Sequence, residues 1–532
     1  MGILLQPLVD YHPWNQLGTL TTLLLASLGA VGLLAWHFRE DKPYVGFKLI
    51  GKERGEWSYE KARERWNNNA FELLRAGFKE THGRPFQVIS PFGPLVMLPP
   101  SLCDEVRNDK RLTFTGFIDR QWLTRYPGLD ILQDGLRGEI IQEAMRKNLN
   151  QELMYLTERL REEASLILRE QLPSSKEWQE VKFFPVATQL AARLSAKILL
   201  GDRLCRDKEW IAVSINFTGV ILRAGRALRA WPVLLRPLVH RFVPTLNYLR
   251  SQITQARKIM EPELAARRLA RDKKERPMDS LSWIDDVRRG REFDVVAGQL
   301  FLTFAAIHTT SSVVTAILHD LLAYPEYFTL LREEIVKVFT EDRGWSKNSL
   351  FKLKLMDSCM KESQRLHILG PRKHIRVLPR GSWTDDLLTR PLDIMNRRVE
   401  EAMTLSDGTH LPKGTLITVA THNTRDTALW GPEPEKFDGH RFLRMREEPG
   451  QENRWQFVST SPEFLAFGHG THACPGRFFA SNEMKIVLAH LIMNYDWRIV
   501  EGKPPASMFV SRFVPDPRTV IGCRARTPEI EL

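Results

Sequence analysis

The residues best suited to chemistry lie in one short segment, FGHGTHACPG, from Phe467 to Gly476. It fits the pattern Phe-x-x-Gly-x-x-x-Cys-x-Gly at every fixed position, and a cysteine thiolate such as that of Cys474 is a strong metal ligand. Gly470 and Gly476 allow backbone conformations and a close approach to a flat macrocycle that side chains would obstruct. Phe467 can pack beside the sulfur and keep water away from it. We therefore predict that this loop presents Cys474 as the axial ligand of a haem iron.

The neighbours of the cysteine allow one further assignment and one alternative. His472 lies two residues before Cys474, where a donor or a cation can meet a haem propionate. The alternative for Cys474 is a buried structural cysteine, which is common for this residue type, but a complete loop in register argues against it. The chain has five cysteines and no CxxC spacing, which argues against a disulfide framework and a structural zinc site.

With this loop the sequence resembles the cytochrome P450 family, a mainly helical fold with a small β region beside the haem. The resemblance covers nearly all of the chain after its N-terminal apolar stretch. KESQR contains Glu362 and Arg365 in an ExxR spacing, which places both side chains on one helical face. PEPEKFDGHRF is similar to the family's aromatic–Arg segment, which implies that Arg441 completes a Glu–Arg–Arg network of structural role. Alone, an ExxR is a surface ion pair in most helices, so its value lies in its position upstream of the cysteine.

FAAIHTTSS, residues 304–312, resembles the family's oxygen-activating helix with one departure. Ala305 and Ala306 leave room for dioxygen, and Thr309 aligns with the family's proton-steering threonine. His308 stands where the family usually has an acid, either to relay protons or to fill space with one satisfied hydrogen bond. The alternative for Thr309 is helix packing, with its hydroxyl bonded back to the preceding turn.

The resemblance implies further haem contacts. Arg146, in EAMRKNL, lies where an early helix can reach a propionate, although an exposed arginine is the simpler interpretation. Arg372, His374 and Arg376 follow the ExxR segment, where the family often places a second propionate partner. We select Arg376 as the candidate and leave the other two open.

The elements that must position these residues begin with an N-terminal anchor. Residues 17–38 carry no Asp, Glu, Lys or Arg and would form about 33 Å of helix, enough to cross a bilayer. Trp14 and Trp36 lie near the two ends of this stretch, and Arg39 and Lys42 follow it, which predicts a cytosolic C-terminal part. A cleaved signal peptide is the alternative, but the apolar run is long and the positive charge lies on the wrong side of it.

The rest of the chain has the composition of a folded enzyme. Of its 532 residues 43% are hydrophobic and 26% are charged, without a low-complexity run. The net charge of +12 suits an anionic membrane or an acidic partner. Nucleic acid is the least supported partner, because Lys and Arg are not interleaved with aromatic residues.

We therefore predict a mainly α cytochrome P450 fold with a small β region, preceded by one transmembrane helix. The expected parts are a lumenal N-terminus (1–16), the anchor (17–38), a linker (39–54) and one catalytic domain (55–532). The patterns favour helices over 59–82, 136–172, 186–200 and 294–322 and a hairpin over 85–100. Residues 378–397 look like an insertion, either a surface loop or a translated intron.

The resemblance implies a haem b (iron protoporphyrin IX) monooxygenase of the endoplasmic reticulum membrane, with its catalytic domain in the cytosol. It would use O2 and electrons from NADPH–cytochrome P450 reductase to oxidise a lipophilic fungal secondary metabolite, a terpenoid first among the classes. Phe304, Ala305 and residues 508–510 are the candidate pocket residues. Two alternatives stay open: a haem-thiolate isomerase or dehydratase that needs no reductase, and a noncatalytic haem-binding membrane protein.

Overall fold

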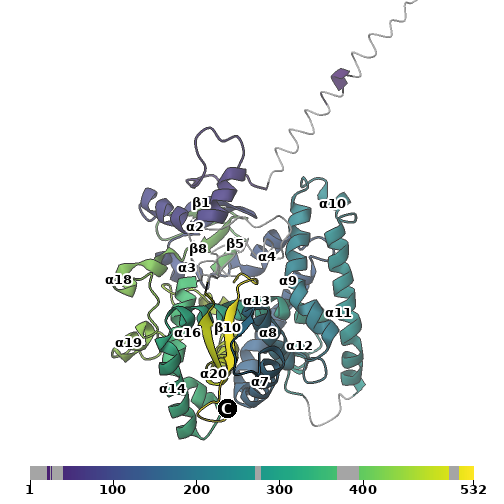
Figure 1. Ribbon diagram of the computed structural model, residues 1–532. Helices are drawn as coiled ribbons and strands as arrows, with labels where there is room; N and C mark the ends of the chain where they lie inside the picture. The colour runs from purple at the N-terminus through teal and green to yellow at the C-terminus, as the bar shows by residue number, and fades with distance from the viewer. Residues whose placement is uncertain (1–20, 24–25, 27–39, 270–276, 368–394, 502–514) are drawn as a thin grey trace, which may run out of the picture.

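The computed structural model describes residues 21–23, 26, 40–269, 277–367, 395–501 and 515–532. Most of these residues are helical (Figure 1). The long helices are α2 (Glu60–Glu80), α7 (Asn150–Gln171), α8 (Phe183–Leu199), α9 (Lys208–Arg229), α11 (Pro244–Leu269), α13 (Val295–Ala323), α14 (Glu326–Asp342), α16 (Lys354–His367) and α20 (Arg477–Asn494). The short helices are α3 (Cys103–Val106), α4 (Phe114–Trp122), α5 (Ile131–Leu136), α6 (Ile140–Ala144), α10 (Arg236–Val239), α12 (Ser280–Arg288), α15 (Lys347–Lys352), α18 (Thr427–Trp430) and α19 (Arg441–Glu447).

The strands form three small sheets in the described residues. The largest has the order β1-β2-β8-β5-β3, and the others are β4-β10-β9 and the pair β6-β7. The strands are β1 (Phe86–Ser90), β2 (Gly93–Leu98), β3 (Leu112–Thr113), β4 (Gln179–Val181), β5 (Met395–Val399), β6 (Met403–Thr404), β7 (His410–Leu411), β8 (Leu416–Val419), β9 (Tyr495–Ile499) and β10 (Ile521–Ala525). The predicted hairpin over 85–100 is β1 and β2, which pair antiparallel. A mainly helical fold with a small β region is therefore confirmed.

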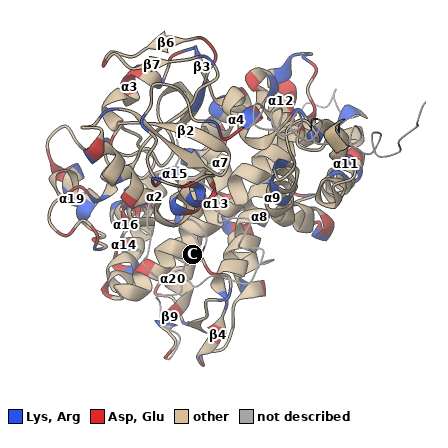
Figure 2. Cartoon of the chain, turned by 90° about the horizontal axis from the view of Figure 1, so that it is seen from above, with Lys and Arg blue, Asp and Glu red and all other residues tan. Residues whose placement is uncertain are grey.

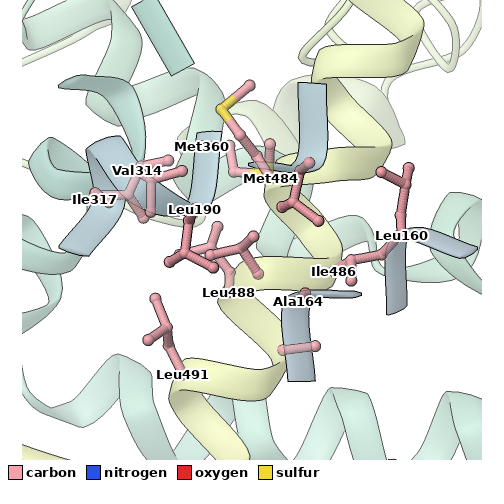
Figure 3. Packing of buried hydrophobic residues seen from close by; sticks show 14 of the residues in the cluster. Leu160, Ala164, Leu190, Val314, Ile317, Met360, Met484, Ile486, Leu488 and Leu491 are labelled. Atoms are coloured by element: carbon pink, nitrogen blue, oxygen red, sulfur yellow. The ribbon is translucent and has the colours of Figure 1, made fainter. Parts of the chain in front are cut away.

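The central helix is α13, which is apolar on nearly every side and largely buried, as a helix inside a core must be. It begins where the Asp294 carboxylate accepts a hydrogen bond from the Ala297 N–H at 3.1 Å, a helix cap. It ends at Tyr324, because Pro325 disfavours helix in the residue before it. Figure 3 shows how α13 meets its neighbours: Val314 and Ile317 lie near residues of α8, α16 and α20.

Charged residues of both signs are interspersed over the outer elements, among them α11 and α19 (Figure 2). The predicted anchor lies outside the described residues except for 21–23 and 26. Within the described residues α9 and α13 are long and apolar enough for a membrane span, yet both are largely buried in the fold. Their apolar character is that of core helices.

Residues 40–50, predicted as part of a linker, instead pack on the edge of the large sheet. Ile50 donates a backbone hydrogen bond to Gln87, and Gln87 donates one to Lys48, each at 2.9 Å. The Gln87 side chain also accepts from the backbone N–H of Tyr44 at 2.8 Å. Charge in the sequence suggested a solvated tether, whereas backbone pairing with β1 holds the segment in place.

The predicted insertion, residues 378–397, lies outside the described residues up to 394. Its last three residues belong to β5, which pairs with β8 on one side and β3 on the other. The C-terminal boundary of any insertion therefore lies before residue 395.

Candidate functional site

The loop around Cys474 lies between a short 3-10 turn, Gly470–His472, and the start of α20. Cys474 donates its backbone N–H to the carbonyl of Phe467 at 2.8 Å, and Arg477 donates to the Cys474 carbonyl at 2.9 Å. Burial raises the pKa of the Cys474 thiol, while the N–H groups of Gly476 and Arg477 lower it. A bound metal cation deprotonates a coordinating thiol outright, so this sulfur suits a metal ligand.

The two glycines of the loop, Gly470 and Gly476, have different surroundings. Gly470 has φ +77°, and a Cβ there would lie 2.6 Å from the side-chain oxygen of Asn108. The same oxygen accepts the backbone N–H of Thr471 at 2.8 Å. The described residues thus bring Asn108 close to Gly470, and the predicted approach of this glycine to a macrocycle stays a prediction. A Cβ at Gly476 would meet no atom of the described residues within 4 Å.

Phe467 is the aromatic residue that begins the loop, and its predicted position beside the sulfur stays a prediction. Its ring meets that of Phe457 edge to face, with centroids 5.3 Å apart and an angle of 89° between the rings. The aromatic contact keeps the loop approach to Cys474 apolar.

The Glu–Arg–Arg network exists in the structure, with Glu362 and Arg365 fully buried. Glu362 accepts two hydrogen bonds from Arg365, at 2.7 and 2.8 Å, and one from Arg441 at 3.1 Å. Arg365 also donates to the carbonyl of Thr424, and Arg441 to that of Trp430. These bonds join α16 to the chain on either side of α18, so the role of the network is structural.

Thr309 and Ala305 are exposed residues of the largely buried α13, four residues apart and thus on one face, where they form an exposed stripe. The Thr309 hydroxyl donates to the Ala305 carbonyl at 2.7 Å, which is the back-bonding of a helical threonine. Its oxygen keeps lone pairs that can accept a further hydrogen bond. Thr309 can therefore bond back to its own helix and still accept a hydrogen bond in a chemical role.

His308 points elsewhere. Its Nε2 lies 3.0 Å from the carbonyl of Ile215, in the middle of α9. Adjacent residues of a helix face different directions, so His308 contacts α9 while Thr309 stays on the exposed stripe. This contact corresponds to the space-filling alternative with a satisfied hydrogen bond.

Two arginines, Arg397 and Arg146, act electrostatically on His472. Besides burial, the charges of Arg397 and Arg146 lower the pKa of the His472 imidazole, while that of Glu139 raises it. Arg146 lies in a π-helical turn, Met145–Leu149, and its side chain is exposed, with one hydrogen bond to the carbonyl of Gln142 at 3.2 Å. π-helical turns occur frequently at functional sites.

Arg397, in β5, is the basic residue that the sequence analysis missed. Its side chain is only 3% exposed, and its Nη1 donates to the Asn396 carbonyl at 2.7 Å. Nε and Nη2 are buried and have no hydrogen-bond partner among the described residues. Burial lowers the pKa of this guanidinium to about 10. A buried guanidinium whose nitrogen atoms lack partners is costly unless an anionic group binds it.

Comparison with known proteins identifies the family. The family model described as Cytochrome P450 matches residues 69–383 and 388–520. The chain belongs to the cytochrome P450 family. It is 36% identical to the cytochrome P450 monooxygenase adrA of Penicillium rubens, over 98% of each chain. It is 35% identical to the monooxygenase hepE of Aspergillus oryzae, over 93% of this chain and 87% of that protein. With ntnM of a Nectria species it shares 38% identity, over 85% of this chain and 83% of the relative.

The protein is thus a cytochrome P450 monooxygenase, and the family implies a haem-thiolate cofactor. The residues fit that cofactor. The P450 loop offers one half-buried thiol at Cys474, space at Gly476 that no described side chain fills and an apolar neighbour in Phe467. Arg397 offers a buried cation for a carboxylate such as a propionate.

The second propionate candidate of the sequence analysis, Arg376, lies outside the described residues, as do Arg372 and His374. The signal that could have found Arg397 is the strand alternation in MNRRV. Alternate residues of a strand face opposite sides, so only one arginine of the pair can be directed inward. Arg397 was overlooked because it lay within the predicted insertion, residues 378–397.

Proposed function

We propose that this P450 monooxygenase of fungal secondary metabolism inserts one atom of O2 into a lipophilic small molecule, with terpenoids as the first substrate class. The observation that carries the proposal is the exposed stripe of Thr309 and Ala305 on α13. Aromatic side chains adjoin it: Phe304 meets Trp122 edge to face at 5.4 Å. Such surroundings favour an apolar substrate. Residues 508–510, also candidates for the pocket, lie outside the described residues.

The haem b cofactor, when bound, supplies O2 binding and activation at its iron. Cys474 would hold the iron, and Arg397, with Arg146 and His472, would hold the propionates. Thr309 would accept a hydrogen bond from ordered water at its hydroxyl oxygen, and so keep a proton source beside the site of oxygen activation. His308 would fix α9 relative to α13 through the carbonyl of Ile215. Glu362, Arg365 and Arg441 would keep the surrounding fold rigid.

The proposed partner is the membrane-bound NADPH–cytochrome P450 reductase, and the proposed location is the endoplasmic reticulum membrane. P450 monooxygenases generally take electrons from a reductase. The anchor predicted over residues 17–38 and the net charge of +12 support both proposals. The catalytic domain would face the cytosol.

The test is co-expression with a reductase in a host that makes candidate terpenoids, followed by mass spectrometry. We expect a product heavier by one oxygen atom that requires NADPH. The variant Cys474→Ala should lose this product and the reduced CO-bound absorption band of a haem thiolate. Cys523→Ala, at a buried cysteine of β10, is the matched control and should keep both. Product formation without NADPH would favour an isomerase, and a CO band without substrate loss would favour a noncatalytic protein.

A further inference from the structure

Two side chains of α16 bind the backbone of the segment that leads into the P450 loop. The Asp357 carboxylate accepts a hydrogen bond from the Phe457 N–H at 2.8 Å. The Lys361 amine donates to the carbonyls of Gln456 and Ser459, at 2.9 and 3.1 Å. Both side chains are buried, and their spacing of four residues places them on one face of the helix. Three backbone groups of this short segment are therefore bound from the same side.

The Lys361 amine is fully buried, and no carboxylate of the described residues lies within ion-pair distance of it. Its Nζ lies 3.7 Å from the ring centroid of Phe464 and 5.4 Å from that of Phe442. Burial lowers the pKa of this amine to about 7, although the charge of Asp357 raises it. Burying a cation without a paired anion costs stability. The stability of the fold alone therefore does not account for a lysine at this position.

The charge of Asp357 is satisfied by two other helices. Its carboxylate lies 3.3 Å from Arg446 of α19 and 2.8 Å from Lys485 of α20. Lys485 also donates to the carbonyl of Leu350 at 3.0 Å. Lys485 is thus a second buried lysine beside Asp357, but its contacts within the described part of the chain do not include residues 456–459.

The bound segment contacts the P450 loop at two points. The Phe457 ring meets the Phe467 ring edge to face, with centroids 5.3 Å apart. Thr460 follows the segment, and its Oγ1 lies 3.0 Å from Nδ1 of His469. The Phe467 carbonyl accepts the Cys474 N–H at 2.8 Å. A displacement of the segment would therefore reach the backbone of the cysteine.

We propose that Lys361 and Asp357 are positioning residues for the thiolate of Cys474. They act by holding residues 456–459 against the P450 loop (467–476). Hydrogen bonds to a ligating sulfur, and the exclusion of water from it, set how strongly the sulfur donates to the metal. Both depend on the conformation of the loop. This inference rests on the proposed ligation of the haem iron by this sulfur.

These contacts are separate from those of the Glu–Arg–Arg network. Arg365 and Arg441 donate to the carbonyls of Thr424 and Trp430, on either side of α18. Lys361, one residue before Glu362 in α16, instead binds the chain directly ahead of the loop. The network and the two positioning residues thus fix different parts of the chain to the same helix.

The test uses the full-length haem protein with Lys361→Met, which removes the amine and keeps much of its volume. The reduced CO-bound band of the thiolate form should convert to that of the protonated thiol about 10-fold faster, the factor that one charge-assisted hydrogen bond contributes. The reduction potential of the iron should shift to more positive values, because water at the sulfur weakens its donation to the metal.

Lys485→Met is the matched control, because it also removes a buried lysine beside Asp357 but no bond to residues 456–459. It should keep the conversion rate and the potential of the wild type. Thr460→Val removes the contact with His469 and should accelerate the conversion, so the test does not depend on the folding of Lys361→Met. Circular dichroism and the urea midpoint report the fold of each variant.

The outcomes separate this inference from the ligation on which it rests. A wild-type protein without the CO-bound thiolate band would overturn the ligation by Cys474, and this inference with it. A wild-type conversion rate in Lys361→Met and Thr460→Val would overturn the positioning role alone. Equal effects of Lys361→Met and Lys485→Met, or a lower urea midpoint of Lys361→Met with an unchanged potential, would also overturn it, because Lys361 would then serve only the fold.

Discussion

Replacing Arg397 by methionine should have opposite effects on the haem-free and the haem-bound protein. Nε and Nη2 of Arg397 are buried without a hydrogen-bond partner among the described residues. An unsatisfied buried polar group costs about 1–3 kcal/mol, and a charged one costs more. Methionine removes the charge and keeps most of the volume. We therefore expect the free energy of unfolding of the haem-free protein to rise by about 1–3 kcal/mol.

In the haem-bound protein the same change should remove the proposed charge-assisted hydrogen bond to a propionate. Such a bond contributes about 1.5–3 kcal/mol, so the Kd for haem should rise about 10- to 150-fold. Urea denaturation followed by circular dichroism measures the first effect. Transfer of haem to an excess of apomyoglobin measures the second.

The neighbouring Arg398→Met is the matched control, because Arg398 lies on the opposite face of β5. It should leave haem affinity within a few-fold of wild type. A haem affinity unchanged by Arg397→Met, together with a lower stability of the haem-free protein, would refute the assignment of Arg397 to a propionate. The guanidinium would then be a structural group of the sheet.

Three further predictions concern stability. Glu362→Ala leaves two buried arginines without their carboxylate and should lower the free energy of unfolding by about 3–5 kcal/mol, measured in urea; a loss below 1 kcal/mol would contradict a buried network. Gly470→Ala should reduce haem retention during purification, because its Cβ would lie 2.6 Å from Asn108 at φ +77°; full retention would contradict the tight packing. Burial raises the pKa of Glu483 to about 8, so the unfolded chain ionises this group first and stability falls as pH rises from about 4.5 to 8. Glu483→Gln should therefore stabilise the protein at pH 8 and have little effect at pH 4, and thermal melts that show the same gain at both values would contradict this.

The sequence predicted the central helix well, since both of its ends carry local signals. Asp294 caps the start of α13, and Pro325 follows its end, so neither boundary depends on tertiary contacts. The directions of its side chains could not be predicted in the same way. Thr309 and His308 are adjacent, and only the packing of α9 against α13 decides that His308 meets Ile215.

The residues that the sequence analysis missed depend on long-range contacts. Glu40 lies in a charged stretch, and nothing local indicates that arginines from α4, α9 and α10 converge on it. Arg397 lies in a strand of five residues whose inward face is set by pairing with β8. The Cys474 loop, in contrast, was found because its glycines and its cysteine are close together in the sequence and act locally.

The π-helical turn Met145–Leu149 determines the phase between two parts of the chain. A π turn holds one more residue than an α turn, so it shifts the helical register by about 100°. Because of this shift, the apolar residues Leu153, Leu156 and Leu160 of α7 face the core, while Arg146 stays on the side of His472. Deleting one residue from this turn would restore a regular α-helix and rotate these two faces relative to each other by about 100°. The extra residue thus sets the rotation of α7 relative to the residues proposed to hold the haem propionates.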